Sequence, residues 1–226
     1  MSNEVKKCRI CGNTNLIPIV SLGNQNLTCV FPKPDSPNPS ESPLDLMLCH
    51  SENNNVCNLV QLKHNADIKE MYGSTYGYFS SISPTMVSHL SDIMSDVIKV
   101  SDLKEGDSVL DIGCNDGTFL NLYDKKRVLN RFGIDPSSQK FKHMFDEDIE
   151  VSFNFFSKTE VDKIIKNKRC KVISSIAMFY DIDDPIQFAR DVKSLLTEDG
   201  IWVVEIAYLP LMMENLAYDQ IMHEHL

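Results

Sequence analysis

The stretch that most constrains this chain is residues 109–120, which read VLDIGCNDGTFL. An apolar run that ends in an acid, followed by a glycine-bounded turn and a second apolar segment, predicts a strand, a tight turn and a helix. This is the first turn of a nucleotide-binding βαβ unit. Gly113 lets the backbone turn sharply beneath a ligand, and Gly117 lets the new helix pack close to the strand.

The residue types in this loop favour one class of ligand. Dinucleotide-binding loops usually read G-x-G-x-x-G, and one of those glycines is missing here. The carboxylates of Asp111 and Asp116 would repel a pyrophosphate, but they suit S-adenosylmethionine, which has an ammonium and a sulfonium and no phosphate. Asp135 stands about 20 residues further on, where an acid binds ribose hydroxyls. We therefore expect an S-adenosylmethionine site, with a nicotinamide-dependent reductase as the less favoured alternative.

The sequence around this loop alternates between helical and strand patterns. A helix is expected to begin with Ser83 as its N-cap and Pro84 as its first residue. A second helix is expected from Pro185 to Gly200, and buried strands are expected at residues 171–178 and 201–206. Such alternation predicts an α/β fold with a parallel, doubly wound sheet that binds ligands at the carboxyl ends of its strands.

Charge and composition exclude several classes of partner. The formal net charge is −10, so no basic field would gather nucleic acid or an anionic membrane surface. The N-terminal residues lack the apolar core of a signal peptide, and Glu205 and Pro210 interrupt the apolar stretches near residue 201. We expect a soluble, cytoplasmic protein that acts on a small molecule.

The cysteines of the N-terminal segment form two pairs. Cys8 and Cys11 have the C-x-x-C spacing of a metal knuckle, and Cys49 and Cys57 form a looser second pair. Four thiolates in two pairs predict a closed, tetrahedral Zn²⁺ site, in which His50 could replace one cysteine. The alternative is two buried thiols and a flexible loop. The intervening loop is expected to lack regular structure because it holds prolines at positions 32, 34, 37, 39 and 43.

The last residues of the chain include His223-Glu224-His225. Two histidines separated by one residue share a face of an extended strand and could bind a metal there, whereas in a helix they point apart. A solvated polar end is the simpler interpretation. Residue types alone do not decide between the two.

Taken together, the motifs resemble the S-adenosylmethionine-dependent sugar C-methyltransferases of deoxysugar biosynthesis. Members of that family have a small N-terminal zinc-binding domain, a class I methyltransferase domain with a Rossmann-like sheet, and a C-terminal domain. The resemblance implies a zinc-binding domain over residues 1–82 and a methyltransferase domain over residues 83–226, without the C-terminal domain. The matching segments are CRICG at 8–12, SLG at 21–23, CNLVQL at 57–62, YGY at 76–78, DIGCNDG at 111–117, GIDP at 133–136 and HEH at 223–225.

The resemblance also implies a reaction. The expected substrate is a nucleotide-linked 4-keto-deoxysugar, whose ketone acidifies a neighbouring C–H bond so that a base can form an enolate. His225 is the implied base, with Glu224 orienting the base or the sugar, and Tyr76 contributing a hydroxyl near the reacting centre. The residues implied to hold the cofactor are Asp111, Gly113, Asn115, Gly117 and Asp135.

This chain departs from the family pattern at three places. Asp181 stands where better-known members have a histidine, and Met222 where they have a tyrosine, so two groups that could serve the enolate are missing. The chain also ends directly after the His-Glu-His segment, so the last strands of the methyltransferase sheet are expected to be absent. Two alternatives therefore stay open: an O- or N-methyltransferase, and a non-catalytic protein that binds zinc and the cofactor.

Overall fold

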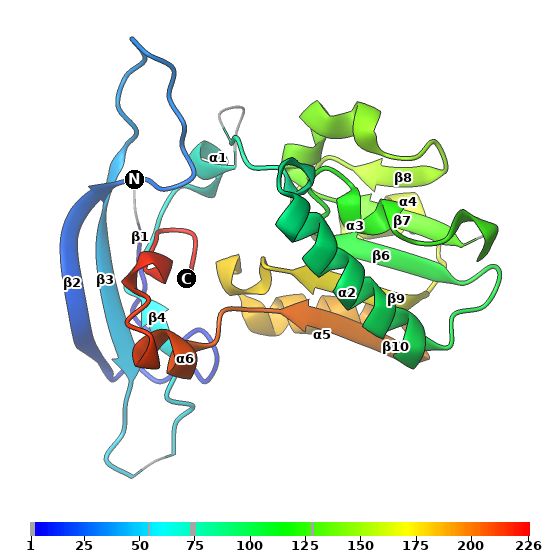
Figure 1. Ribbon diagram of the computed structural model, residues 1–226. Helices are drawn as coiled ribbons and strands as arrows, with labels where there is room; N and C mark the ends of the chain where they lie inside the picture. Colours follow the sequence, from blue (N-terminus) through cyan, green and yellow to red (C-terminus); the bar gives the residue numbers. More distant parts are fainter. Residues whose placement is uncertain (1–2, 54, 73–75, 128) are drawn as a thin grey trace. The chain divides into compact units, whose positions relative to one another are not determined.

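The computed structural model describes residues 3–53, 55–72, 76–127 and 129–226. The chain divides into two compact units (Figure 1). The first unit consists of Met1–Gly77, Phe179–Gln187 and Ile206–Leu226. The second consists of Tyr78–Met178 and Phe188–Glu205.

The second unit contains a five-stranded sheet in which every pair is parallel (Figure 1). The order is β10-β9-β6-β7-β8, so the chain proceeds from β6 to one edge and then returns to fill the other. This reversal places the topological switch point between β6 and β9, where such sheets bind ligands. The predicted α/β class is confirmed. The strands are β6 (Ser108–Ile112), β7 (Asn130–Ile134), β8 (Ile149–Ser152), β9 (Cys170–Ile176) and β10 (Leu196–Glu205).

The helices of the second unit begin largely where the sequence predicts. Ser83 caps the longest helix, and its side chain accepts a hydrogen bond from the Met86 N–H. The segment after Asp135 is a 3₁₀ helix. The elements are η1 (Ser80–Ile82), α2 (Pro84–Ser101), α3 (Thr118–Asn121), η2 (Lys125–Arg127), η3 (Pro136–Met144) and α4 (Lys158–Ile165).

Helix α5 (Pro185–Leu195) begins at the predicted proline but ends earlier than predicted. Gly200 lies inside strand β10, which pairs with β9 from Leu196 onwards. A Cβ on Gly200 would lie 3.0 Å from the carbonyl oxygen of Cys170 in β9. The glycine therefore permits β10 to pack closely against β9. Gly200 therefore marks close strand packing and not the end of a helix.

The main hydrophobic core lies in the second unit, between α2 and the sheet. All five residues of β6 are buried, as the apolar run predicts. The buried members of the core are Leu90, Met94, Val97, Leu103, Val109, Cys114, Phe119, Leu120, Tyr123, Ile149 and Val172. This packing fixes the carboxyl end of β6, from which the glycine loop departs.

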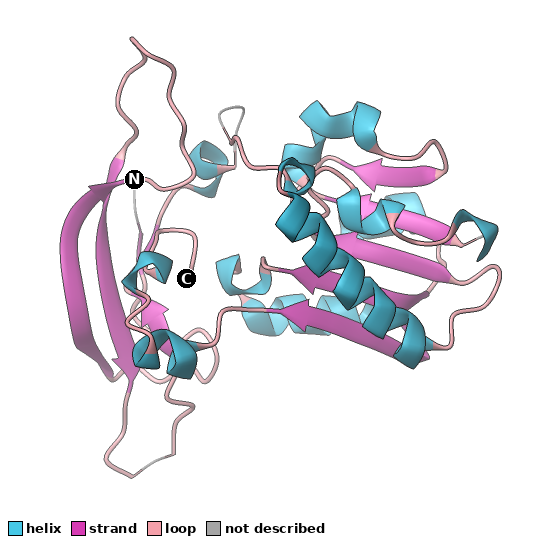
Figure 2. Ribbon diagram, in the orientation of Figure 1, coloured by secondary structure: helices cyan, strands magenta, loops and turns pink. Residues whose placement is uncertain are grey.

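The first unit consists mainly of strands and loops (Figure 2). Strands β2 (Leu16–Asn26), β3 (Glu41–Cys49) and β4 (Val60–Leu62) form an antiparallel sheet, and β1 (Asn3–Glu4) pairs with β5 (His64–Asn65). Its remaining elements are α1 (Ile68–Met71), η4 (Phe179–Asp181), α6 (Leu209–Glu214) and η5 (Tyr218–Gln220).

The expected irregular loop is shorter than its prolines indicate. Residues 27–40 lack helix and strand, but Pro43 lies in β3 and pairs with Asn24. Strand β4 pairs only with residues 46–48 of β3, so Pro43 breaks no ladder on that side. Within the described ranges, no helix is long and apolar enough to cross a bilayer.

Candidate functional site

The two glycines of the predicted loop adopt conformations that favour glycine. Gly113 directly follows β6 with φ +78°, and its N–H donates to the carbonyl oxygen of Ile134 at 2.9 Å. A Cβ on Gly113 would lie 2.9 Å from Cγ of Met178. Gly117 has φ +81°, and a Cβ there would lie 2.6 Å from the ring of Phe145. Gly117 therefore makes room for an aromatic ring at the start of α3.

Asn115 organises the loop from the inside. It has φ +48°, and its backbone N–H donates to Oδ2 of Asp135 at 2.9 Å. Its side-chain Oδ1 accepts from the N–H of Ser80 at 3.0 Å, and its Nδ2 donates to the carbonyl of Tyr78 at 3.2 Å. The side chain thus ties the loop to the segment that precedes α2.

Asp116 is bonded both to η1 and to the start of α3. Its carboxylate accepts from the N–H of Ser81 at 2.8 Å and from the N–H and hydroxyl of Thr118 at 3.1 and 2.7 Å. The residue is only 1% exposed. These bonds fix Asp116 at the start of α3, so its carboxylate shapes the loop.

Asp111 lies buried in β6, two residues before the first glycine of the loop. Its Oδ1 accepts a hydrogen bond from the hydroxyl of Ser174 at 2.6 Å, across the register between β6 and β9. Burial raises the pKa of Asp111 to about 7, and the nearby charge of Asp135 contributes. Sequence reasoning missed Ser174, although two adjacent serines inside an apolar strand were a visible signal.

Asp135 directly follows β7, the neighbour of β6. Its Oδ1 accepts from the Ser137 N–H at 2.6 Å, and its Oδ2 accepts from the Asn115 N–H at 2.9 Å. Burial raises the pKa of Asp135, although these hydrogen bonds oppose the shift. Each carboxylate oxygen keeps further acceptor capacity. The preceding Gly133 is required by close packing, because a Cβ there would lie 2.7 Å from Sγ of Cys114.

The four predicted zinc ligands come together in the first unit. The sulfur atoms of Cys8, Cys11, Cys49 and Cys57 all lie within 4.8 Å of one another. Cys8 and Cys57 are 3.3 Å apart at sulfur, and Cys11 and Cys49 are 3.5 Å apart. Four sulfurs at these separations fit the donor set of a closed tetrahedral Zn²⁺ site. His50 is not a member of this group.

Arg9, inside the first cysteine knuckle, was not singled out by sequence reasoning. Its side chain is 3% exposed, and its guanidinium bonds to the side chains of Asp183 and Asn65. Its backbone N–H donates to Oε1 of Gln61 at 3.0 Å. Asn65 also donates to Asp183 at 2.6 Å. The knuckle is therefore connected to residues 179–187, far along the chain.

The His-Glu-His segment is not a solvated end. His223 is 1% exposed, and its Nε2 bonds to the carbonyl oxygen of Ser42 at 3.1 Å. His225 places Nδ1 2.8 Å from the carbonyl oxygen of Gln220, and its ring contacts that of Tyr180 at 4.3 Å between centroids. Each imidazole thus bonds to a different backbone carbonyl, so this turn does not bring the histidines together as metal ligands.

Glu224 and Tyr76 lie in the same unit as His225. Oε2 of Glu224 accepts from the thiol of Cys29, and its Oε1 lies 4.0 Å from Nε2 of His225. The ring of Tyr76 is half-buried and lies 5.3 Å from that of Tyr72. The three residues implied as catalytic therefore belong to one compact unit.

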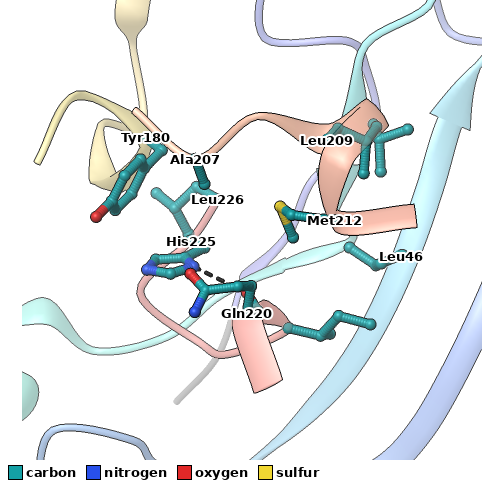
Figure 3. A pocket seen from close by; sticks show the side chains of 10 residues that line it. Leu46, Tyr180, Ala207, Leu209, Met212, Gln220, His225 and Leu226 are labelled. Atoms are coloured by element: carbon teal, nitrogen blue, oxygen red, sulfur yellow. Dashed lines mark hydrogen bonds between the residues drawn. The ribbon is translucent and has the colours of Figure 1, made fainter. Parts of the chain in front are cut away.

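A pocket of about 140 Å³ opens beside His225 (Figure 3). Figure 3 shows His225 bonded to Gln220 at one side of the pocket, with the ring of Tyr180 beside the imidazole and mainly apolar side chains around the remainder. The lining is thus mainly apolar, and its polar side chains are the imidazole of His225, the amide of Gln220 and the phenol of Tyr180. Its lining residues are Leu46, Val60, Tyr180, Ala207, Leu209, Met212, Gln220, Ile221, His225 and Leu226.

Comparison with known proteins identifies two family models along this chain. The family described as "Methyltransferase domain" matches residues 86–226, which include the glycine loop. The family described as "Putative zinc binding domain" matches residues 8–72, which include the four cysteines. The two matches together confirm the predicted classes of domain.

The individual relatives have low sequence identity to this chain. The C-methyltransferase NovU from Streptomyces niveus is 25% identical over 226 residues, which are 98% of this chain and 52% of NovU. The chain thus spans about half the length of this relative. Two solved structures are similar at lower identity. The plantazolicin methyltransferase BpumL with a pentazolic desmethylPZN analog and SAH is 18% identical, covers 63% of this chain and 55% of its own, and has a TM-score of 0.48. Coclaurine N-methyltransferase with N-methylheliamine and SAH is 16% identical and has a TM-score of 0.40. The match covers 57% of this chain and 38% of that enzyme's chain.

The sequence motifs, the parallel sheet and the family matches agree with one another. The methyltransferase-domain model covers more than half of the chain. The expected cofactors, S-adenosylmethionine and Zn²⁺, are those of the two matched domain classes, and the cysteine cluster supplies four metal ligands. The chain belongs to the methyltransferase-domain family and carries a zinc-binding region at its N-terminal side.

Proposed function

We propose that this chain binds S-adenosylmethionine at the glycine loop and C-methylates a nucleotide-linked keto-deoxysugar. One observation carries the proposal: Asp111 near the end of β6 and Asp135 directly after β7 flank a loop whose glycines adopt positive φ. The relative NovU, a C-methyltransferase, supports transfer to carbon. Residues 1–82 form the zinc-binding domain in this proposal, and residues 83–226 the methyltransferase domain.

The residues around the loop fit the proposed cofactor. Asp135 accepts the ribose hydroxyls with the acceptor capacity that its two backbone bonds leave free. Gly113 lets the cofactor lie against the backbone, while Asn115 and Gly117 hold the turn open. Asp111 provides negative charge for the cationic tail. When bound, S-adenosylmethionine supplies an electrophilic methyl group to which a carbanion-like carbon forms its new bond.

His225 is the proposed base that removes the proton beside the ketone. A backbone carbonyl only accepts hydrogen bonds, so the contact with Gln220 fixes the proton of the neutral ring on Nδ1. Nε2 then carries the free lone pair. Glu224, 4.0 Å from this nitrogen, orients the ring or the sugar, and Tyr76 provides a hydroxyl near the reacting centre.

Calorimetric titration of the chain with S-adenosylhomocysteine tests the cofactor assignment, with a reduced nicotinamide cofactor titrated in parallel. Saturable binding of the first ligand alone is expected. Binding of only the nicotinamide cofactor would overturn the assignment and favour a reductase.

Methyl transfer to a nucleotide-linked 4-keto-deoxysugar then tests the reaction. His225→Ala should lower the rate of transfer by roughly 10²–10⁴-fold, the usual contribution of a general base, while cofactor affinity stays unchanged. His143→Ala, at an exposed histidine of η3, is the control. Methylation of oxygen or nitrogen would favour the O- or N-methyltransferase alternative. Cofactor binding without any turnover would favour the non-catalytic one.

A further inference from the structure

The carboxyl group of Asp181, a buried group of the first unit, has a hydrogen-bond partner at one of its two oxygens. Asp181 ends η4, and its Oδ2 accepts a hydrogen bond from the hydroxyl of Tyr72 at 2.8 Å. Its other oxygen, Oδ1, is buried and has no hydrogen-bond partner within the described part of the chain. A buried polar atom without a partner is costly, so it commonly marks a place where a ligand binds.

The groups that face Asp181 come from three other segments. Tyr72 follows α1, Cys29 lies between β2 and β3, and Glu224 lies near the C-terminal end. Burial raises the pKa of Asp181 to about 8, the Tyr72 hydrogen bond opposes the shift, and the charge of Glu224 adds to it. Burial likewise raises the pKa of both Tyr72 and Cys29, which therefore stay neutral near pH 7.

Asp181 also belongs to the neighbourhood of the proposed catalytic residues. The ring of Tyr180, the preceding residue, contacts the imidazole of His225, and the Tyr180 carbonyl accepts from the N–H of Leu226 at 2.9 Å. Tyr72, its hydrogen-bond donor, stacks at a tilt against Tyr76. The carboxyl group thus contacts Tyr72, which contacts Tyr76, and its neighbour in sequence, Tyr180, contacts His225.

We propose that Asp181 is a further catalytic residue, whose protonated carboxyl donates a hydrogen bond from Oδ1 to the carbonyl oxygen of the acceptor. This inference rests on the proposed function. The Tyr72 hydroxyl occupies Oδ2, so the acid proton resides on Oδ1, the atom without a partner. A neutral acid is suited to this place because Glu224 already brings a carboxylate there.

The proton and electron balance of the step is simple. The C–H proton beside the ketone passes to Nε2 of His225, and the electron pair of that bond delocalises onto the carbonyl oxygen as an enolate. The O–H of Asp181 strengthens its hydrogen bond to the new oxyanion and keeps its proton. When the carbon forms its bond to the methyl group, the electrons return from oxygen and the ketone is restored, while the electron pair of the broken methyl–sulfur bond would stay on the departing S-adenosylhomocysteine. Removing one such donor typically costs 10²–10³-fold in rate.

Three variants of the full chain test the assignment. Asp181→Leu removes the donor at similar size, and Asp181→Asn restores a donor that cannot ionise. Asp219→Asn, at an exposed carboxylate in the same unit, is the matched control. The probe is a nucleotide-linked 4-keto-deoxysugar. The measured quantities are methyl transfer and, with S-adenosylhomocysteine bound, exchange of the proton beside the ketone with deuterated solvent.

The leucine variant should lose roughly 10²–10³-fold in both rates, with partial recovery in the asparagine variant and no loss in the control. Wild-type rates should fall above about pH 8, where Asp181 loses its proton, and the asparagine variant should lack this fall. Full rates in the leucine variant, or an alkaline fall that persists in the asparagine variant, would overturn the proposal.

Infrared difference spectra separate this proposal from the function on which it rests. Wild type minus Asp181→Asn should show the carbonyl stretch of a protonated carboxyl at pH 6.5 and its loss at pH 9.5. A carboxylate band at pH 6.5 overturns the role of Asp181 even if the sugar is methylated. A protonated carboxyl in a chain that neither methylates the sugar nor exchanges its proton overturns the proposed function instead, and with it the catalytic role.

Discussion

The two units of this protein obtain their order from different sources. In the second unit, every residue of β6 is buried and an apolar cluster lies between the sheet and α2. In the first unit, β2 is mostly exposed, and four cysteines converge on one point beside a short sheet. Burial of apolar surface accounts for the first case, whereas a small strand-rich module with little core depends on a metal.

The buried polar side chains around the glycine loop and those in the first unit also differ in their hydrogen bonding. Around the glycine loop, Asn115 and Asp116 use their side chains to bond other parts of the loop and the segment before α2. In the first unit, Oδ1 of Asp181 and Nδ1 of His223 are buried without partners in the ranges that the structure describes. Asn115 and Asp116 are therefore bonded within the second unit, where Asp135 keeps acceptor capacity for a ligand, and Asp181 keeps such capacity in the first unit.

Removal of zinc should produce the largest effect and should affect the first unit alone. Structural Zn²⁺ contributes roughly 10–16 kcal/mol of apparent binding free energy in small zinc modules, and this is folding free energy. A strong chelator, or Cys49→Ser, should abolish hydrogen-exchange protection of β3 while β6 stays protected. Cys170→Ala, at a buried thiol in β9, should keep one zinc per chain. Retained protection of β3 in a zinc-free chain would contradict the metal-dependent order of this unit.

The pH dependence of stability should reveal the buried carboxyl in the second unit. The pKa of Asp111 is about 7 in the folded chain, against about 3.9 for an unfolded aspartate. Because the folded state binds the proton of Asp111 more tightly than the unfolded state, this proton stabilises the fold. Its contribution to the free energy of unfolding is complete below about pH 4 and is lost as pH rises towards 7. The free energy of unfolding should fall by up to about 1.4 kcal/mol per pH unit over this range, and Asp111→Asn should remove this slope.

Urea unfolding followed by fluorescence of Trp202, the one tryptophan and a residue of the second unit, measures this slope. Asp146→Asn provides a control of opposite sign. Burial raises the pKa of Asp146, but hydrogen bonds from Lys125 and Arg131 outweigh burial and lower it. Its contribution is therefore present above its unfolded pKa and is lost as pH falls. An unchanged slope in Asp111→Asn would show that this carboxyl is ionised in the folded chain.

Asp135→Ala should weaken S-adenosylhomocysteine binding without unfolding the second unit. Hydrogen bonds to charged groups contribute about 1.5–3 kcal/mol, so the loss should be roughly 10–150-fold in Kd. Asp135→Asn should lose less because it retains one acceptor oxygen. Asp92→Ala, on the exposed face of α2, should bind like wild type. Equal affinity in Asp135→Ala and wild type would contradict the placement of the ribose beside β7.

The features that sequence predicts well here are local ones. The strand, the glycine turn, the Ser83 cap and the start of α5 all depend on residues within a few positions of one another. The four cysteines were predictable because few other uses explain paired thiols in such a module. Helix and strand ends were less predictable, since Gly200 has the same letter whether it ends a helix or permits close strand packing.

The missed features depend on residues distant in sequence. Arg9 bonds to Asp183, 174 positions away, and Cys29 bonds to Glu224, 195 positions away. The first unit also contains residues 179–187 and 206–226, which the alternating pattern assigns to the α/β sheet domain. No periodicity in either segment encodes such contacts. The negative charge of Asp116 is evident from the sequence. The hydrogen bond that it accepts from the N–H of Ser81 in η1, 35 positions earlier, is not.

Ser174→Ala should produce the smallest effect and should sharpen the account of Asp111. The lost hydrogen bond to a carboxyl group should cost about 1 kcal/mol. Because this bond favours the ionised form of Asp111, the cost should be larger at pH 8 than at pH 6, and the pKa of Asp111 should rise further. Ser175→Ala is the matched control on the same strand. Ser175 is also buried, but it accepts from the neutral indole of Trp202 at 3.2 Å, so its loss should not vary with pH. Equal costs at both pH values for Ser174→Ala would show that the serine does not stabilise the charge, and the cofactor tail would then meet a neutral acid at this position.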